Sequence, residues 1–302
     1  MLEHSFGGTW TEVKLAALRD YLTAYRAVFT GNAKAKYFKT WYVDAFAGTG
    51  SRSIENRKYC LFDIDESQPD SDEESQSDSD AFAYLDGSAK IALGMHSPFD
   101  RYLFIEKSRA RVDELKGTID SEYPNLSSRC EFEQLDANVP LSAWCAKRDW
   151  KKERAVVFLD PYGMQVEWNT VNLLGRTKAI DLWYLFPLGV VRMLPKDGKI
   201  EQSWQDRLDT LFGTSDWRDH FYKTSTVTNL FGEQDVTNRD ATVRNVQSYI
   251  EGRLKTAFTA VAPSLVLKNS KMSPMFALCF AAGNERGAPI ALRIAKSILK
   301  ED

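Results

Sequence analysis

Apolar positions recur at intervals of three and four residues between Trp10 and Phe29, which is the spacing of an amphipathic helix. The following segment, 39–46, is rich in aromatic and β-branched residues and runs into a turn that contains two glycines. Near-continuous apolar strands that alternate with helical stretches are typical of a parallel sheet covered by helices on both faces. The pattern therefore predicts a doubly wound, mostly parallel α/β fold of the Rossmann-like kind. Four further apolar runs are strand candidates, at 101–106, 130–135, 155–159 and 179–186.

The rhythm changes between 196 and 262, where apolar residues again follow a helical spacing, as in Leu208, Leu211 and Phe212. This stretch is expected to be a helical insertion that serves as a substrate or partner region. The chain then closes with strand candidates at 264–267 and 275–281 and a last helix. The domain prediction is an N-terminal helical segment at 1–38, an α/β domain made of 39–195 and 263–302, and the insertion at 196–262.

The charge is unevenly distributed. Residues 61–80 hold nine acids and no Lys or Arg, and such a segment is expected to be a disordered acidic loop. Without it, 39 basic residues face 33 acidic ones, so the rest of the chain carries +6. A mildly basic body is compatible with an RNA or DNA substrate, and equally with a neutral enzyme that has a solvated acidic loop.

The composition argues against several protein classes. No run of about 18 apolar residues is present, so no membrane span is expected. The N-terminus lacks the features of a secretory signal. The four cysteines are scattered without C-x-x-C spacing, and only three histidines accompany them, so we expect no metal site and no disulfide framework. These features favour a cytoplasmic location.

The string Asp44-Ala-Phe46-Ala-Gly48-Thr-Gly50 follows the strand that begins the predicted sheet. Glycines so close to a strand let a ligand approach the backbone where a side chain would clash. The third glycine of the dinucleotide pattern G-x-G-x-x-G is replaced by Ser53. The acid that precedes the turn suits a ligand amine or hydroxyl. A tight turn that merely needs glycine is the alternative, but the whole string favours a ligand site.

Two other acids stand at the ends of predicted strands. Glu106 ends the run at 101–106, and an acid at this place in nucleoside-binding folds accepts hydrogen bonds from ribose hydroxyls. Asp136 follows the run at 130–135 and is a candidate acceptor for an adenine amino group. An Asx turn leading into the next helix explains Asp136 almost as well.

The string Asp160-Pro161-Tyr162-Gly163 follows the run at 155–159. An exocyclic amine on a planar base is a poor nucleophile because its lone pair is delocalised into the ring. A carboxylate and a backbone carbonyl can hold its two N–H groups while an aromatic ring stacks on the base. Asp160, the Pro161 carbonyl and Tyr162 supply these groups in consecutive positions and are the predicted catalytic residues. A β-turn with proline at its second position is the alternative.

In chain order, these four motifs resemble motifs I to IV of class I S-adenosylmethionine-dependent methyltransferases. The D-P-Y-G string is similar to the D/N-P-P-Y/F motif of methyltransferases that act on adenine amines, but it lacks the second proline. It is closer to the D-P-F/Y-G form of the tRNA guanine-N2 dimethyltransferases. Over nearly the whole chain, the sequence resembles the three-Cys-motif partner family (TcmP), through the strings YVDAFAGTG, FIEK, VVFLDPYGMQVEW and IDLWYLFPLG.

The resemblance implies a class I methyltransferase-like fold with S-adenosylmethionine as the cofactor. Two hypotheses follow. The chain is a methyltransferase acting on an exocyclic amine of a base in RNA or DNA, or it is a methyltransferase-like binding module that acts with a separate three-Cys-motif protein. The predicted cofactor-binding residues are Asp44, Phe46, Gly48, Gly50, Glu106 and Asp136.

Overall fold

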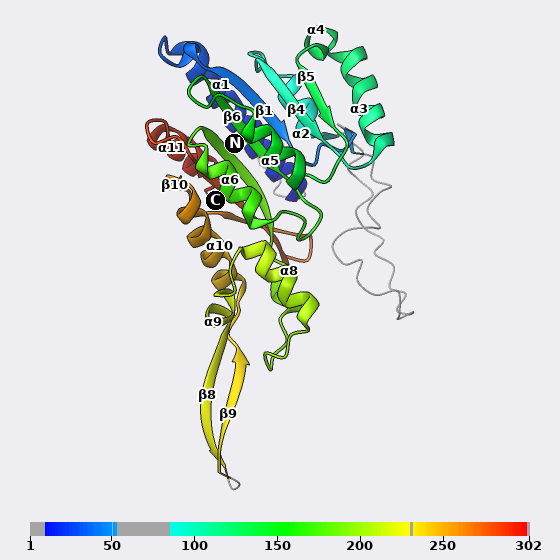
Figure 1. The fold of residues 1–302 in the computed structure, drawn as a ribbon. Helices are drawn as coiled ribbons and strands as arrows, with labels where there is room; N and C mark the ends of the chain where they lie inside the picture. The colour runs from blue at the N-terminus through cyan, green and yellow to red at the C-terminus, as the bar shows by residue number, and fades with distance from the viewer. Residues whose placement is uncertain (1–9, 50, 53–84, 230–231, 301–302) are drawn as a thin grey trace, which may run out of the picture.

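The computed structural model describes residues 10–49, 51–52, 85–229 and 232–300. Its centre is a twisted sheet in which five neighbouring strands run parallel (Figure 1). The last long strand, β12, runs antiparallel to β7 and also pairs with β11 (Leu265–Lys268). The order across the sheet is β5 (Cys130–Glu133), β4 (Arg101–Ile105), β1 (Lys39–Asp44), β6 (Glu153–Leu159), β7 (Ile180–Pro187), β12 (Pro274–Ala282) and β10 (Ala260–Val261).

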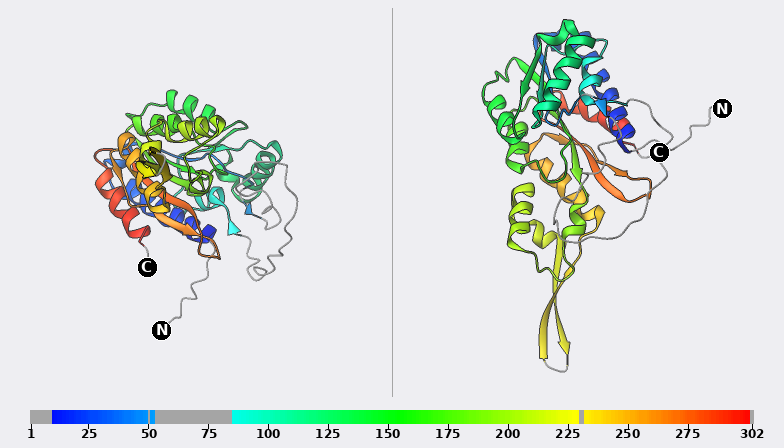
Figure 2. Two further views of the ribbon diagram at one scale, coloured as in Figure 1. Left: turned by 90° about the horizontal axis from the view of Figure 1, so that it is seen from below. Right: turned by 90° about the vertical axis from the view of Figure 1, so that its right-hand side faces the viewer.

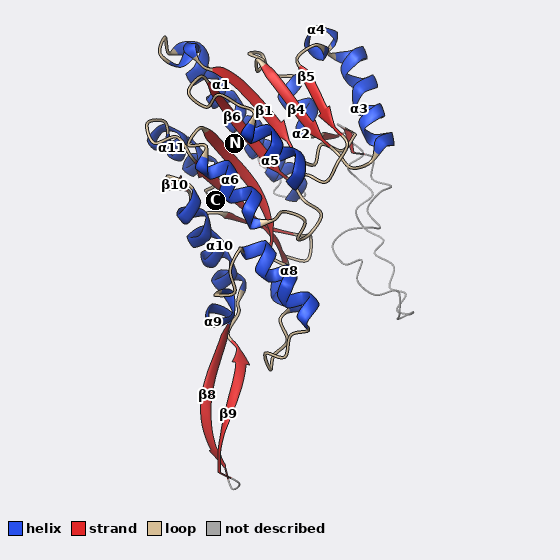
Figure 3. Ribbon diagram, viewed as in Figure 1, coloured by secondary structure: helices blue, strands red, loops and turns tan. Residues whose placement is uncertain are grey.

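Helices cover both faces of this sheet (Figures 2 and 3). One face packs on α1 (Trp10–Gly31), α2 (Ser88–Leu93), α3 (Arg109–Glu122) and α11 (Ala288–Ile298). The other packs on α5 (Asn138–Ala146), α6 (Trp168–Arg176), α8 (Gln202–Phe212), α9 (Trp217–Phe221) and α10 (Val243–Ala257). Short elements connect these layers: 3-10 helix η1 (Ala35–Tyr37), strands β2 (Ser51–Arg52) and β3 (Leu85–Asp86), and helices α4 (Pro124–Ser127) and α7 (Val190–Met193). The predicted doubly wound, mostly parallel α/β fold is confirmed.

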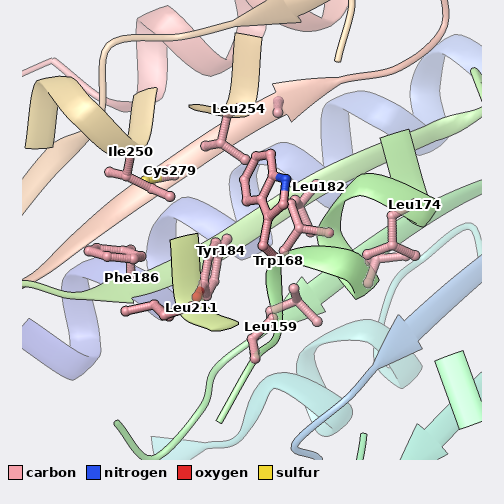
Figure 4. Close-up of a cluster of buried hydrophobic side chains, with 14 of the residues drawn as sticks. Leu159, Trp168, Leu174, Leu182, Tyr184, Phe186, Leu211, Ile250, Leu254 and Cys279 are labelled. Carbon is pink, nitrogen blue, oxygen red and sulfur yellow. The ribbon is translucent and has the colours of Figure 1, made fainter. Parts of the chain in front are cut away.

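Strand side chains alternate between the two cores because successive residues of a strand point to opposite faces. In β1, Trp41 and Val43 belong to the core under α5 and α6, whereas Tyr42 belongs to the core under α1. The first of these cores extends under α8 and α10, where Trp168 packs beside Leu254 and Leu182 (Figure 4). Both faces of each central strand are therefore buried, which explains the near-continuous apolar runs in the sequence.

The insertion at 196–262 is only partly helical. Helices α8, α9 and α10 are present, but a long hairpin of β8 (Tyr222–Asn229) and β9 (Gly232–Arg239) separates α9 from α10. It projects away from the rest of the molecule (Figure 1). Threonines alternate along β8, and the hydroxyls of Thr224 and Thr237 bond across the hairpin at 3.0 Å. The prediction of helix throughout this stretch was wrong for the hairpin, because polar β-branched alternation favours strands.

The remaining elements lie close to their predicted positions. The helix predicted from Trp10 becomes α1, and the predicted closing strands and last helix become β11, β12 and α11. The predicted acidic loop at 61–80 lies outside the described residues. No helix of the described ranges is both long and apolar enough to cross a bilayer.

Candidate functional site

The predicted site residues lie along one edge of the sheet. Strands β6, β1, β4 and β5 are neighbours and parallel, so their carboxyl ends meet at the same edge. The turn after β1 is hydrogen-bonded to the neighbouring strands β6 and β4: Ala45 N donates to Phe158 O, and Ala47 N donates to Ile105 O. The acids that follow these strands are Asp160, Asp44, Glu106 and Asp136.

Asp44 lies beneath the turn that follows β1, with no exposed surface. Its Oδ1 accepts a hydrogen bond from Phe46 N at 3.2 Å, and its Oδ2 accepts one from the Tyr42 hydroxyl at 3.2 Å. Burial raises the pKa of this carboxyl from 3.8 to about 6, against the opposing effect of its hydrogen bonds with Ser88 and Phe46. Asp44 therefore organises the turn from below.

Gly48 occupies the left-handed region with φ of 59°, a conformation that glycine adopts without the cost a Cβ would add. Among the described residues, no atom lies within 4 Å of where a Cβ on Gly48 would be, so none of them fills that side of the turn. The Gly48 amide donates to Oε2 of Glu106 at 3.1 Å. Phe46 is partly buried beside the turn, and Gly50 lies outside the described residues.

Glu106 connects the turn after β1 to the start of α3. Its Oε2 accepts from Gly48 N, and its Oε1 accepts from Ser108 N at 2.9 Å. Arg111 Nη1 is 3.9 Å from Oε2. Glu106 is 8% exposed, and its carboxylate is held by these two backbone hydrogen bonds.

Asp136 is exposed and bonds to its own helix start. Its Oδ1 accepts from Asn138 N at 3.1 Å and from Asn138 Nδ2 at 2.9 Å, which is the Asx-type arrangement expected as the alternative for this residue. Asn138 also donates to Gln165 O and accepts from Glu167 N and the Thr170 hydroxyl. Asn138 stands in the turn expected after Asp136, but its contacts with the loop after β6 were not predicted; they connect that loop to the start of α5.

The D-P-Y-G string forms a tight loop after β6. Gly163 has φ of 75°, and Tyr162 N donates to the side-chain oxygen of Gln165 at 3.0 Å. Pro161 is buried, whereas the Tyr162 side chain is 50% exposed. An aromatic ring is thus presented at the site edge next to Asp160.

Lys14 on α1 contacts the carboxylate of Asp160. The distance from Lys14 Nζ to Asp160 Oδ2 is 2.5 Å, and the side chains are 0% and 9% exposed. The Trp10 ring lies 4.9 Å from Nζ. In the sequence, the only sign of this contact is that a lysine stands on the buried stripe of α1, in line with Leu18 and Tyr21.

The structure thus joins Gly48 to Glu106 and Phe46 to Asp44 by hydrogen bonds, and it adds Lys14 to Asp160. The aromatic residues Trp183, Tyr184 and Phe186 of β7 are buried core residues. Among the residues that the structure describes, no group of three or more His, Cys, Asp or Glu side chains is placed to hold a metal ion.

No protein-family model and no curated protein match this chain. Solved structures with a similar chain path include protein LPL1258 from Legionella pneumophila, at 14% identity over 82% of this chain and 93% of that one, with a TM-score of 0.38. An S-adenosylmethionine-dependent methyltransferase from Clostridium acetobutylicum matches at 8% identity over 89% and 92%, with a TM-score of 0.36. The methyltransferase domain of bacterial CtHen1 matches at 13% identity over 87% and 98%, with a TM-score of 0.36. Likenesses this distant say nothing about substrate or reaction.

Proposed function

We propose that this chain is an S-adenosylmethionine-dependent methyltransferase that acts on an exocyclic amine of a base in RNA or DNA. The observation that supports this most is the convergence of Asp44, Glu106 and Asp160 at one sheet edge, around a glycine turn and next to an exposed tyrosine ring. This edge, at the carboxyl ends of parallel strands, is where ligands bind in open α/β sheets.

The residues at this edge fit the proposed cofactor. The carboxylate of Glu106 uses one lone pair of each oxygen for backbone amides, and its remaining lone pairs can accept from the two ribose hydroxyls. Asp136 uses Oδ1 for both bonds to Asn138, so Oδ2 can accept from the adenine amino group. Leu135 and Val139 are 51% and 65% exposed and offer apolar surface to the adenine ring. The turn around Gly48, together with Phe46 and Gly50, would bind the amino-acid part of S-adenosylmethionine.

The target amine would be held by the loop after β6. Asp160 and the Pro161 carbonyl accept the two N–H groups, and the exposed Tyr162 ring stacks on the base. S-adenosylmethionine supplies a methyl group on a sulfonium, which is already an activated donor. Lys14 fixes the position of the Asp160 carboxylate, so that alignment of the amine precedes the reaction.

The test has two stages. Calorimetric titration with S-adenosylmethionine measures cofactor binding, and transfer of labelled methyl to pooled cellular RNA and DNA, followed by nucleoside analysis, measures the reaction. We expect label on a base amine, and its loss in Lys14→Met/Asp160→Ala, which removes both charges of the buried pair together, with cofactor affinity retained. Label on a carbon or a ribose oxygen would contradict the amine assignment.

The alternative is a methyltransferase-like module that acts with a separate three-Cys-motif protein. The β8–β9 hairpin favours this reading, because within the described residues its strands pair only with each other and most of its described side chains are exposed. A two-stranded ribbon is only marginally stable by itself in water, so a partner that covers it would stabilise it. Tight cofactor binding without transfer to any nucleic acid would favour this alternative.

A further inference from the structure

A pocket lies at the opposite edge of the sheet from the candidate site. Its volume is about 480 Å³, and it is formed by α1, α2, the loop before β4 and Tyr123. One of its lining residues, Arg26, donates to the hydroxyl of Thr40 at the start of β1. The predicted catalytic and cofactor residues follow the opposite ends of these strands, so the two sites are separate.

The pocket is basic. Arg19 and Arg26 line it from α1, Lys90 from α2 and His96 from the loop before β4. Among the described residues that line it, none is Asp or Glu. Glu122 pairs with Lys90 from outside the lining, at 2.8 Å, so the positive charge that faces the pocket comes mainly from the two arginines.

Arg26 is only 8% exposed, and hydrogen bonds hold its guanidinium in place. Its Nε donates to Ser97 O at 3.0 Å, and its Nη1 donates to the Thr40 hydroxyl at 2.6 Å. The guanidinium also lies 5.2 Å from the centre of the Phe99 ring. A guanidinium has five N–H donors, so these bonds leave donors that can serve a ligand in the pocket. A buried, oriented guanidinium recognises a phosphate better than a mobile surface lysine does.

Apolar and aromatic groups lie beside this charge. The lining includes Ile91, Met95 and the ring of Tyr123, and the volume is in the range of small-molecule sites. We propose that the pocket binds a phosphate-bearing ligand of nucleotide size, with the phosphate at Arg19, Arg26 and His96 and the base against Met95 and Tyr123. The phosphate can belong to a free nucleotide or to a nucleic-acid chain, and the experiment separates these two sources.

The test is calorimetric titration of the full chain with uridine monophosphate, uridine, inorganic phosphate and a short uridine oligonucleotide. Uracil ligands are chosen because an adenine nucleotide could enter the proposed cofactor site. We expect uridine monophosphate or the oligonucleotide to bind at least tenfold more tightly than uridine. Arg19 is exposed, so Arg19→Ser should fold normally and weaken that binding at least fivefold. Arg286→Ser, which removes an exposed arginine elsewhere, is the matched control and should change nothing.

Binding by the mononucleotide identifies a free nucleotide as the ligand, and binding by the oligonucleotide alone identifies a nucleic-acid phosphate. Equal affinity for uridine and its monophosphate, combined with no oligonucleotide binding, would overturn the proposal. So would an equal effect of Arg19→Ser and Arg286→Ser. Arg19→Ser should bind S-adenosylmethionine like the wild type. A negative result for the nucleotide pocket therefore would not count against the methyltransferase proposal.

Discussion

The ammonium group of Lys14 lies 2.5 Å from the Asp160 carboxylate, although 146 residues separate the two in the chain. The lysine is fully buried, and the aspartate is 9% exposed. Removing a charge from water costs free energy, and in this pair each ion compensates the charge of the other. The contact links α1 to the loop after β6 and makes the helix part of the candidate site.

Replacement of Lys14 by methionine should destabilise the protein by about 3–5 kcal/mol, because it leaves a nearly buried carboxylate without its cation. The double variant Lys14→Met/Asp160→Asn should recover part of this loss, since neither charge is then present. Urea unfolding of the wild type, both single variants and the double variant measures the coupling. If the effects of the two single substitutions simply add, the pair contributes nothing and the interpretation is wrong.

Glu106→Ala should weaken S-adenosylmethionine binding by about 1.5–3 kcal/mol, since bonds to a charged group are lost and the turn at Gly48 is released. Glu106→Gln retains one acceptor oxygen and should lose less. Glu114→Ala, at an exposed position of α3, serves as the control. Calorimetry at constant ionic strength provides the affinities. Wild-type affinity in Glu106→Ala would remove this residue from the site.

The sequence was sufficient to predict most of the fold. Buried parallel strands have strong apolar runs, and the helices of this chain carry regular apolar stripes, so both types of element are visible in one sequence. The hairpin was missed because its described side chains are mostly polar and exposed, and it lies far along the chain from the main sheet. Strand β8 begins 35 residues after the end of β7, and β9 ends 21 residues before the start of β10. Without burial, alternation of threonines is a weak signal compared with the helical stripes on either side.

The site was predictable only in part, because a motif gives position along the chain and not contacts between elements. Asp44 was expected to face a ligand, but the structure buries it below the turn. The contacts that Lys14 and Asn138 make with other elements were not predicted, since a local pattern does not show which distant residue will be the partner. The buried face of α1 nevertheless gives one indication, because Lys14 stands among apolar residues there and a buried lysine needs a buried acid as its partner.

Tyr162 should contribute to substrate binding and not to folding, because half of its side chain is exposed. Tyr162→Phe keeps the ring and should retain methyl transfer, whereas Tyr162→Ala should lose stacking worth about 1–3 kcal/mol. Steady-state kinetics with the nucleic acid identified by the labelling experiment, together with thermal melting of each variant, gives the test. A melting temperature that falls sharply in Tyr162→Ala would mean that the ring serves the fold.

Asp44 should make stability depend on pH. Burial raises the pKa of this carboxyl to about 6 in the folded chain, against 3.8 when unfolded. The folded state therefore holds the proton more tightly, and its stability falls as pH rises from about 4 to about 6 and is then constant. Asp44→Asn has no proton to lose and can keep the bond from Phe46 N, so it should exceed the wild type by about 2–3 kcal/mol at pH 8. Below pH 4 the difference should vanish.

Chemical unfolding at pH 4, 6 and 8 measures this effect, and the exposed substitution Asp20→Asn on α1 controls for the loss of one surface charge. The gain of Asp44→Asn should grow between pH 4 and 6 and level off above pH 6, while Asp20→Asn should follow the wild type throughout. If Asp44→Asn is more stable than the wild type by the same amount at every pH, the difference in stability comes from packing and not from ionisation of Asp44. A loss of stability at pH 8 would mean that the ionised carboxylate is needed to hold the turn, and that the pKa of Asp44 lies below its usual value.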